Sequence, residues 1–173
     1  MNLEEALKSA AGLMALAART APKAAGKDYL VLHLVTGEEL TRLAAAMQAY
    51  GQETGKPNFD RDAAGVARSS AVLLVGLKDA APAGLDCGAC GRERCAELAP
   101  REGPEFRGGF CAWRLVDLGI ALGSAVKTAG LLNVDNRIMY RAGVAARRLG
   151  LVEADVLLGI PLSATGKNIY FDR

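Results

Sequence analysis

Ala71-Val-Leu-Leu-Val-Gly-Leu77 predicts the centre of the molecule. The segment has the length of a β-strand, and none of its side chains is charged or polar. A strand that is apolar on both faces is usually buried on both faces. The sequence therefore predicts a sheet that has this strand in its interior and helices packed on either side.

Two further apolar segments predict strands. Residues 29–35, Tyr-Leu-Val-Leu-His-Leu-Val, are expected to form a second buried central strand in which His33 is hydrogen-bonded and partly buried. Residues 156–160 are expected to form a third buried strand that Pro161 ends. Helical periodicity or capping signals predict helices over residues 3–18, 36–51, 115–131 and 137–149, and residues 51–62 are expected to form a loop.

The order of these segments predicts the fold class. Strands that alternate with helices indicate an α+β protein with an α/β-like order, in which a central sheet is flanked by helices. The length of 173 residues, with 51% hydrophobic side chains, fits one ordinary domain over residues 1–173. Residues 84–112 are rich in glycine, proline and charge and hold all four cysteines, so we predict an inserted cluster-binding loop there.

Charge and hydropathy argue against several classes of partner. The chain has 21 Lys and Arg against 19 Asp and Glu, too even a balance for a nucleic-acid-binding face. The longest apolar region, 115–132, is interrupted by Asp117 and Lys127, so no membrane span is expected. Met1-Asn-Leu-Glu-Glu5 lacks the basic start of a secretory signal, and a cytoplasmic protein is expected.

The four cysteines have the spacing C-x2-C-x4-C-x15-C: Cys87, Cys90, Cys95 and Cys111. Disulfides rarely persist in a reducing compartment, so metal binding is the leading interpretation. Three thiolates from one curling loop and a fourth from further along suit a [4Fe–4S] cluster. A structural zinc site is the alternative, although zinc sites more often pair two short Cys-x2–4-Cys knuckles.

The segment from Asp86 to Cys95 resembles the [4Fe–4S] module of corrinoid iron–sulfur proteins and of membrane electron-transport subunits. Almost the whole chain also resembles a family of uncharacterised bacterial and archaeal proteins described as containing a ferredoxin domain. The matching stretches are residues 18–23, 87–95, 117–121, 134–137 and 160–173. This resemblance implies that the four cysteines hold an iron–sulfur cluster.

A second resemblance concerns the scaffold. Ala17-Ala-Arg-Thr-Ala-Pro22, which leads into the first expected strand, is similar to the turn that contacts flavin mononucleotide (FMN) in nitroreductase-like flavoproteins. Residues 117–131 correspond to the central dimer helix of that fold, and residues 149–161 to its last helix and strand. The resemblance implies a nitroreductase-like sheet, a homodimer and FMN as a cofactor, although Lys23 replaces the serine usual in that turn.

Cations on two segments are candidates for holding the flavin phosphate. Arg19 and Lys23 lie around the Pro22 turn, while Lys167 and Arg173 lie in the C-terminal tail. Ordinary solvated surface charge is the competing interpretation for each of them.

These observations lead to two hypotheses about function. The first is an iron–sulfur redox protein that transfers electrons to or from a flavin or small-molecule partner, an oxidoreductase if it is an enzyme. The second is a non-catalytic binding or carrier module in which the cluster or a zinc ion is structural. The single histidine and the absence of an interpretable Ser/His/Asp or Cys/His set argue against hydrolase chemistry.

Overall fold

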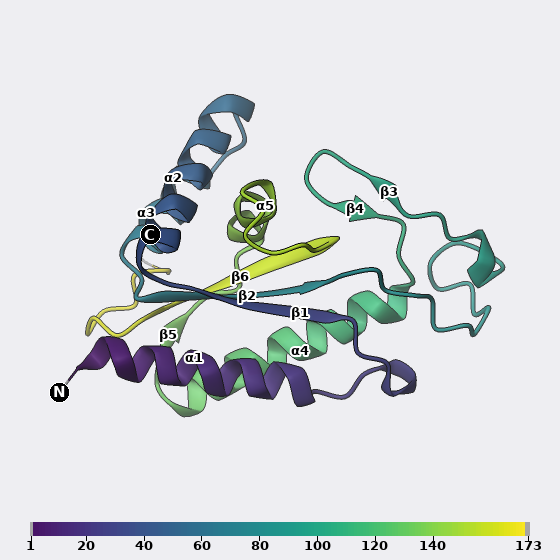
Figure 1. Ribbon diagram of the computed structural model, residues 1–173, viewed down its shortest axis with the longest axis horizontal. Helices are drawn as coiled ribbons and strands as arrows, with labels where there is room; N and C mark the ends of the chain where they lie inside the picture. Colours follow the sequence, from purple (N-terminus) through teal and green to yellow (C-terminus); the bar gives the residue numbers. More distant parts are fainter. Residues whose placement is uncertain (1, 172–173) are drawn as a thin grey trace.

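Strand β2 (Ala71–Leu77) is buried at every position and lies inside a four-stranded sheet of order β1-β2-β6-β5. The computed structural model describes residues 2–171. The other strands are β1 (Leu30–Val35), β6 (Val156–Ser163) and the short β5 (Asp135–Asn136), and each neighbouring pair is antiparallel. The predicted α+β class, a central sheet flanked by helices, is confirmed (Figure 1).

Helices cover both faces of the sheet, as Figure 1 shows. One layer contains α1 (Leu3–Thr20) and α4 (Ala112–Leu131), and the other contains α2 (Gly37–Thr54), α3 (Phe59–Ala67) and α5 (Tyr140–Arg148). Alternate side chains of β2 point to opposite faces of the sheet. Leu73, Val75 and Leu77 pack with α1 and α4. Val72 and Leu74 pack with α2, α3 and α5. The apolar run of β2 therefore fills two cores at once.

Strand β1 differs from its prediction as a buried central strand. It lies at the edge of the sheet and pairs only with β2 among the described strands, and Leu34 is 37% exposed. An apolar segment indicates a strand, but it does not report how many neighbours that strand has. His33 is partly buried and hydrogen-bonded, as the sequence predicts, and its partner is Glu39, with 3.0 Å between Nε2 and Oε2.

The expected loop over residues 51–62 is wrong, because helices occupy most of it. Helix α2 continues to Thr54 and ends at Gly55, whose φ of 67° is left-handed, and α3 begins at Phe59. Gly51 lies inside α2, and a Cβ placed there would be 2.5 Å from Cβ of Phe59. The glycine permits close contact between the two helices and does not end the first one.

Strand β6 continues through Pro161, which was expected to end it. The Leu162 carbonyl accepts a hydrogen bond from the Ser70 N–H, while Gly159 exchanges two hydrogen bonds with Met139 on the other side of the strand. Because backbone groups alternate along a strand, the Pro161 nitrogen faces the side of β5 and Met139. Pairing on that side is interrupted between β5 and Met139, so no hydrogen bond is lost.

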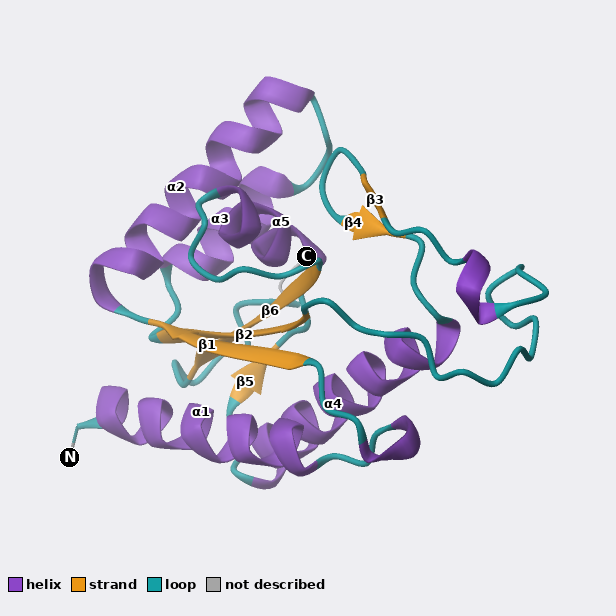
Figure 2. Ribbon diagram, turned by 45° about the vertical axis from the view of Figure 1, so that its right-hand side comes forward, coloured by secondary structure: helices purple, strands orange, loops and turns teal. Residues whose placement is uncertain are grey.

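Residues 78–111 connect β2 to α4 and extend beyond one end of the sheet (Figures 1 and 2). They contain the 3-10 turn η2 (Cys95–Glu97) and a two-stranded hairpin, β3 (Arg101–Glu102) and β4 (Arg107–Gly108). A second 3-10 turn, η1 (Ala24–Gly26), follows α1. Within residues 2–171 no helix combines the length and hydropathy needed to cross a bilayer.

Candidate functional site

The four cysteines line one small hollow between the 78–111 segment and the start of α4. Cys87, Cys90, Cys95 and Cys111 all contribute to its wall, together with Trp113 at the start of α4. All four are free thiols. The structure therefore brings the four predicted ligands to one place, although they lie in two separate parts of the segment.

Cys111 is the fixed member of the group. It is 3% exposed and caps the N-terminus of α4, where its carbonyl accepts a hydrogen bond from the Arg114 N–H at 3.0 Å. Its backbone is held by the start of this 20-residue helix. This end of α4 therefore provides a rigid anchor for a metal ligand.

The other three cysteines lie on a loop that turns back on itself. Gly88 and Gly91 have φ values of 75° and 79°, and the Gly91 N–H donates to the Gly88 carbonyl at 2.9 Å. The Oδ1 of Asp86 accepts a hydrogen bond from the Cys95 N–H at 2.6 Å. Asp86, to which sequence reasoning assigned no role, thus closes the loop and draws Cys95 back towards Cys87.

Cys87 has the most distinctive surroundings of the four thiols. The indole N–H of Trp113 donates to its Sγ, with 3.3 Å between nitrogen and sulfur. Hydrogen bonds from the Ala89 N–H first, then from Trp113, hold the pKa of the Cys87 thiol below its ordinary value. The anionic form, which binds metal, therefore costs less free energy at Cys87 than in an ordinary thiol.

The arrangement of the four sulfurs bears on both candidate metals. Among residues 2–171 no group of three or more His, Cys, Asp or Glu side chains is placed to hold a single metal ion. A zinc ion requires its sulfurs to converge, since each Zn–S bond is about 2.3 Å. An iron–sulfur cluster is larger than a single ion and is bound by four thiolates arranged around it. Four cysteines around one hollow are the donor set that such a cluster requires.

Arg19 and Lys23, proposed from the sequence as phosphate ligands, hold the turn that follows α1. Arg19 pairs with Asp28 at 2.7 Å and donates to the Leu30 carbonyl at 3.0 Å. Lys23 donates to the carbonyls of Arg19 at 2.6 Å and Ala21 at 2.7 Å. Both cations therefore already have partners within this turn.

The two segments that carry the proposed phosphate ligands do not meet in the described chain. The segment after β6, which contains Lys167, lies well apart from the end of α1 along the long axis of the molecule (Figure 1). Arg173 lies outside the described residues. The structure places Arg19 beside Lys23, and it does not bring Lys167 to them.

A buried ion pair that sequence reasoning missed connects the cysteine segment to the rest of the protein. Arg114 is 1% exposed and lies 3.0 Å from Asp117, one turn later in α4. Arg114 donates to the carbonyls of Ala81 at 2.8 Å and Ala24 at 3.0 Å, and Asp117 accepts from the Ala24 N–H at 2.8 Å. The pair therefore joins α4, the turn after α1 and the base of the 78–111 segment.

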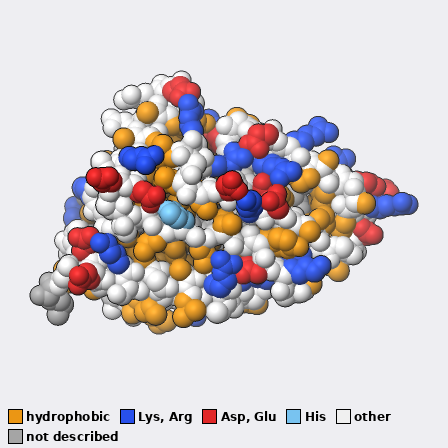
Figure 3. All heavy atoms as spheres, viewed as in Figure 1, with side chains coloured by type: hydrophobic (Ala, Val, Ile, Leu, Met, Phe, Trp, Pro, Cys, Tyr) orange, Lys and Arg blue, Asp and Glu red, His pale blue; other side chains and the backbone are white. Residues whose placement is uncertain are grey.

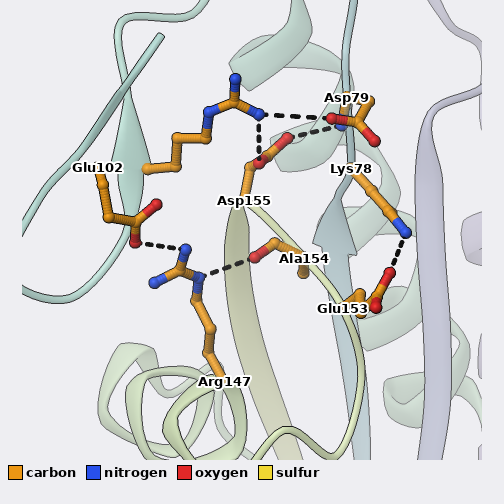
Figure 4. Close-up of polar contacts among 8 residues, drawn as sticks. Lys78, Asp79, Glu102, Arg147, Glu153, Ala154 and Asp155 are labelled. Carbon is orange, nitrogen blue, oxygen red and sulfur yellow. Dashed lines mark hydrogen bonds and ion pairs between the residues drawn. The ribbon is translucent and has the colours of Figure 1, made fainter.

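The β3–β4 hairpin is held to the ends of β2 and β6 by charged groups (Figure 4). Arg107 lies 3.3 Å from Asp155 and 3.4 Å from Asp79, while Arg147 pairs with Glu102 and donates to the Ala154 carbonyl at 2.8 Å. Lys78 and Glu153 form a further pair at the same end of the sheet. These contacts fix the second half of the 78–111 segment.

Glu105, at the tip of that hairpin, makes a second attachment to the helices. Its carboxylate accepts hydrogen bonds from Tyr50 at 2.9 Å, Lys56 at 2.6 Å and Tyr140 at 2.6 Å. Burial raises the pKa of Glu105, but the donors outweigh it and leave the pKa below the ordinary value. Sequence patterns contained no signal for this contact, because its partners lie 35 to 55 residues away.

Comparison with known proteins identifies related sequences. Residues 107–173 match the family described as "Uncharacterized protein containing a ferredoxin domain (DUF2148)", a stretch that includes Cys111. A relative from Archaeoglobus fulgidus, named "Uncharacterized protein", is 51% identical over 171 residues, which are 98% of this chain and 92% of that protein.

Solved structures with a similar fold include nitroreductases. Nitroreductase A from Vibrio parahaemolyticus has a TM-score of 0.58 at 15% identity, covering 93% of this chain but 59% of its own. A nitroreductase from Desulfitobacterium hafniense, solved with bound FMN, has a TM-score of 0.59 at 15% identity and covers 92% of this chain and 78% of its own. At such identities the likeness shows the fold alone.

The relative covers almost the whole chain, the family match covers its C-terminal part with Cys111, and the structural neighbours agree with the sheet and its two helical layers. A ferredoxin domain indicates an iron–sulfur protein. This chain therefore belongs to the family of proteins described as containing a ferredoxin domain (DUF2148), and it has a nitroreductase-like fold.

Proposed function

We propose that this protein is an iron–sulfur redox protein in which Cys87, Cys90, Cys95 and Cys111 hold one [4Fe–4S] cluster. The observation that carries the proposal is that all four free thiols line the same hollow. When bound, such a cluster transfers single electrons, and four thiolate ligands occupy all of its iron sites.

The chain's own residues supply the environment for that chemistry. The start of α4 holds the backbone of Cys111, and the Asp86 carboxylate holds the backbone N–H of Cys95. The hollow is small, and Ala83, Leu85 and Ala89 contribute to its lining. These residues orient the thiolates and limit the access of water, which affects the reduction potential.

The electron partner in this proposal is a flavin or another small molecule. The fold shared with nitroreductases, one of them solved with FMN, supports a flavin. Arg19 and Lys23 remain the proposed phosphate ligands on one segment. Lys167 and Arg173 remain proposed ligands on the C-terminal segment, whose described part lies apart from Arg19 and Lys23 in one chain and would have to reach the flavin from a second copy (Figure 1). Because Arg19 and Lys23 already have partners in their turn, FMN binding would exchange some of those hydrogen bonds for phosphate contacts.

A homodimer is the second part of the proposal, with α4 at its interface. The outer surface of α1 and α4 carries exposed apolar side chains, among them Leu16, Val116 and Ile120, and Figure 3 shows apolar side chains gathered along this edge. Gly119 and Gly123 lie on the exposed side of α4, and a Cβ on either would meet nothing within 4 Å. Glycine inside a helix costs about 1 kcal/mol relative to alanine, so close approach by a second copy would account for both residues.

A non-catalytic carrier or binding module is the alternative function. Two sets of contacts, at Glu105 and at Arg107, already fix the hairpin half of the 78–111 segment. The cysteine half has Asp86 and Trp113 as its side-chain contacts to the thiol-bearing residues. In this alternative, a cluster or a zinc ion bound to the four cysteines would cross-link the cysteine half and order it, without taking part in any reaction.

Anaerobic purification followed by metal, sulfide and flavin analysis separates these functions. A brown protein with about four irons and matching sulfide supports the redox proposal, whereas a colourless protein with one zinc ion supports the carrier module. Cys95→Ser should lose or degrade the cluster, while Glu93→Gln, on the exposed part of the same loop, should retain it. Equal iron in the two variants would remove Cys95 from the ligand set, and flavin absorbance in the wild type would support the FMN proposal.

A further inference from the structure

We infer that Trp113 sets the reduction potential of the cluster by donating its indole N–H to the sulfur of Cys87. This inference rests on the proposed function, because it assigns a role to a residue beside the proposed cluster. It goes further in naming one side chain that controls the electron affinity of the site.

The position of Trp113 points to a role beyond packing. Its side chain belongs to neither of the two hydrophobic cores, and the residue is 40% exposed. It lies in the first turn of α4, two residues after the buried Cys111, and lines the same hollow as the four thiols. A large aromatic side chain that is left partly in solvent is not explained by burial alone.

The contact itself has one chemical direction. The indole nitrogen is a donor only, so the Cys87 sulfur, 3.3 Å away, is the acceptor. A thiolate accepts such a hydrogen bond more strongly than a thiol does. Cys87 lies on the exposed loop and Trp113 on a 20-residue helix, so the scaffold aims the donor at the ligand.

The energetic consequence follows from charge. Reduction adds one electron to the cluster and increases the negative charge shared by its sulfurs, while the indole proton stays on nitrogen. The hydrogen bond is therefore stronger in the reduced state and favours it, which raises the reduction potential. The Cys87 sulfur also receives the backbone N–H of Ala89, which side-chain substitution leaves in place, so Trp113 can be tested separately from it.

The decisive variant is Trp113→Phe, which keeps an aromatic ring and removes the donor. In a potentiometric titration of the holoprotein with dithionite, followed by electron paramagnetic resonance, its midpoint should become more negative. At the wild-type midpoint the ratio of reduced to oxidised cluster should fall about fivefold, the effect expected of one hydrogen bond. Leu85→Ala, on the rim of the same hollow and 62% exposed, changes water access but no donor and should shift the midpoint less.

A second measurement uses the wild-type chain and does not depend on the variant retaining its cluster. The protein contains one tryptophan, so incorporation of indole-¹⁵N tryptophan labels Trp113 alone. Pulsed electron paramagnetic resonance of the reduced protein should detect ¹⁵N coupling to the cluster. In a wild-type protein with an intact cluster, the absence of ¹⁵N coupling would overturn the inference but not the proposed function, and so would an unchanged midpoint in a cluster-bearing Trp113→Phe variant. A protein without iron would overturn both.

Discussion

Arg114 and Asp117 lie 3.0 Å apart on successive turns of α4, and both side chains are buried. Each also hydrogen-bonds to Ala24 in the turn after α1, and Arg114 reaches Ala81 at the base of the cysteine segment. One ion pair therefore connects the helix that begins beside Cys111, the turn proposed for flavin and the segment that carries the other three thiols.

Removing one partner of this pair should destabilise the whole fold. Asp117→Leu would leave the Arg114 guanidinium buried without a counter-charge, which typically costs about 3–5 kcal/mol. Urea unfolding followed by far-ultraviolet circular dichroism measures the loss. Glu38→Gln, an exposed acid in the first turn of α2, is the control and should change the free energy of unfolding by about 0.5 kcal/mol or less. A loss for Asp117→Leu no larger than that of the control would contradict this role.

Asp86 should be needed for loading the metal site. Asp86→Ala removes the oxygen that accepts the Cys95 N–H, so the loop would no longer be closed before the cluster assembles. The expected result is less iron per chain after anaerobic reconstitution, or slower uptake. Asp86→Asn keeps an acceptor oxygen and should retain most of the iron of the wild type. If alanine and asparagine lower the iron content equally, the hydrogen bond is not the reason for the aspartate.

Glu105 should make the stability of the protein depend on pH. Burial opposes ionisation, but the hydrogen bonds from Lys56, Tyr140 and Tyr50 leave its pKa below the ordinary value. A carboxyl whose pKa is lowered by folding stabilises the protein above its unfolded pKa, and that contribution is lost as the pH falls through the folded pKa. Glu105→Gln should therefore lose about 1–3 kcal/mol at pH 7 and much less near pH 3.

The test of the Glu105 prediction compares urea unfolding of the variant and the wild type at several pH values. The two curves of free energy against pH should converge in acid. Glu97→Gln, an exposed carboxylate in the same segment, should run parallel to the wild type at every pH. A gap between Glu105→Gln and the wild type that stays constant down to pH 3 would show that packing of the hairpin, and not the charge of Glu105, holds it.

Gly123→Ala should report whether α4 meets a second copy. In an isolated chain the added methyl group meets nothing within 4 Å, so alanine should stabilise the helix by about 1 kcal/mol. In the proposed dimer the methyl group would enter the interface and weaken it. Sedimentation equilibrium should then show a raised dimer dissociation constant. The control Gln52→Ala, at an exposed position of α2, should leave that constant unchanged. A monomeric wild type, or a stabilised variant with unchanged association, would remove α4 from the interface.

Some sequence predictions were wrong for a shared reason. Gly51 looks like a helix terminator, but it permits Phe59 to pack closely against α2. Pro161 looks like a strand terminator, but its nitrogen lies where the strand has no partner to lose. In each case the local residue has its usual chemistry, and its neighbour in space decides the outcome.

The sequence by itself determined the strand at the centre of the sheet, the class of fold and the set of four thiols, because apolar runs, helical periodicity and cysteine spacing are local properties of the chain. Tertiary structure alone decided that β1 lies at an edge, that Glu105 holds the hairpin and that Trp113 donates to Cys87. Such contacts join residues that are 26 or more positions apart, and their energies depend on burial and direction. Burial and hydrogen-bond direction are defined only once the chain has folded. For this reason the hydrogen bond from Trp113 to Cys87 can be seen only in the tertiary structure.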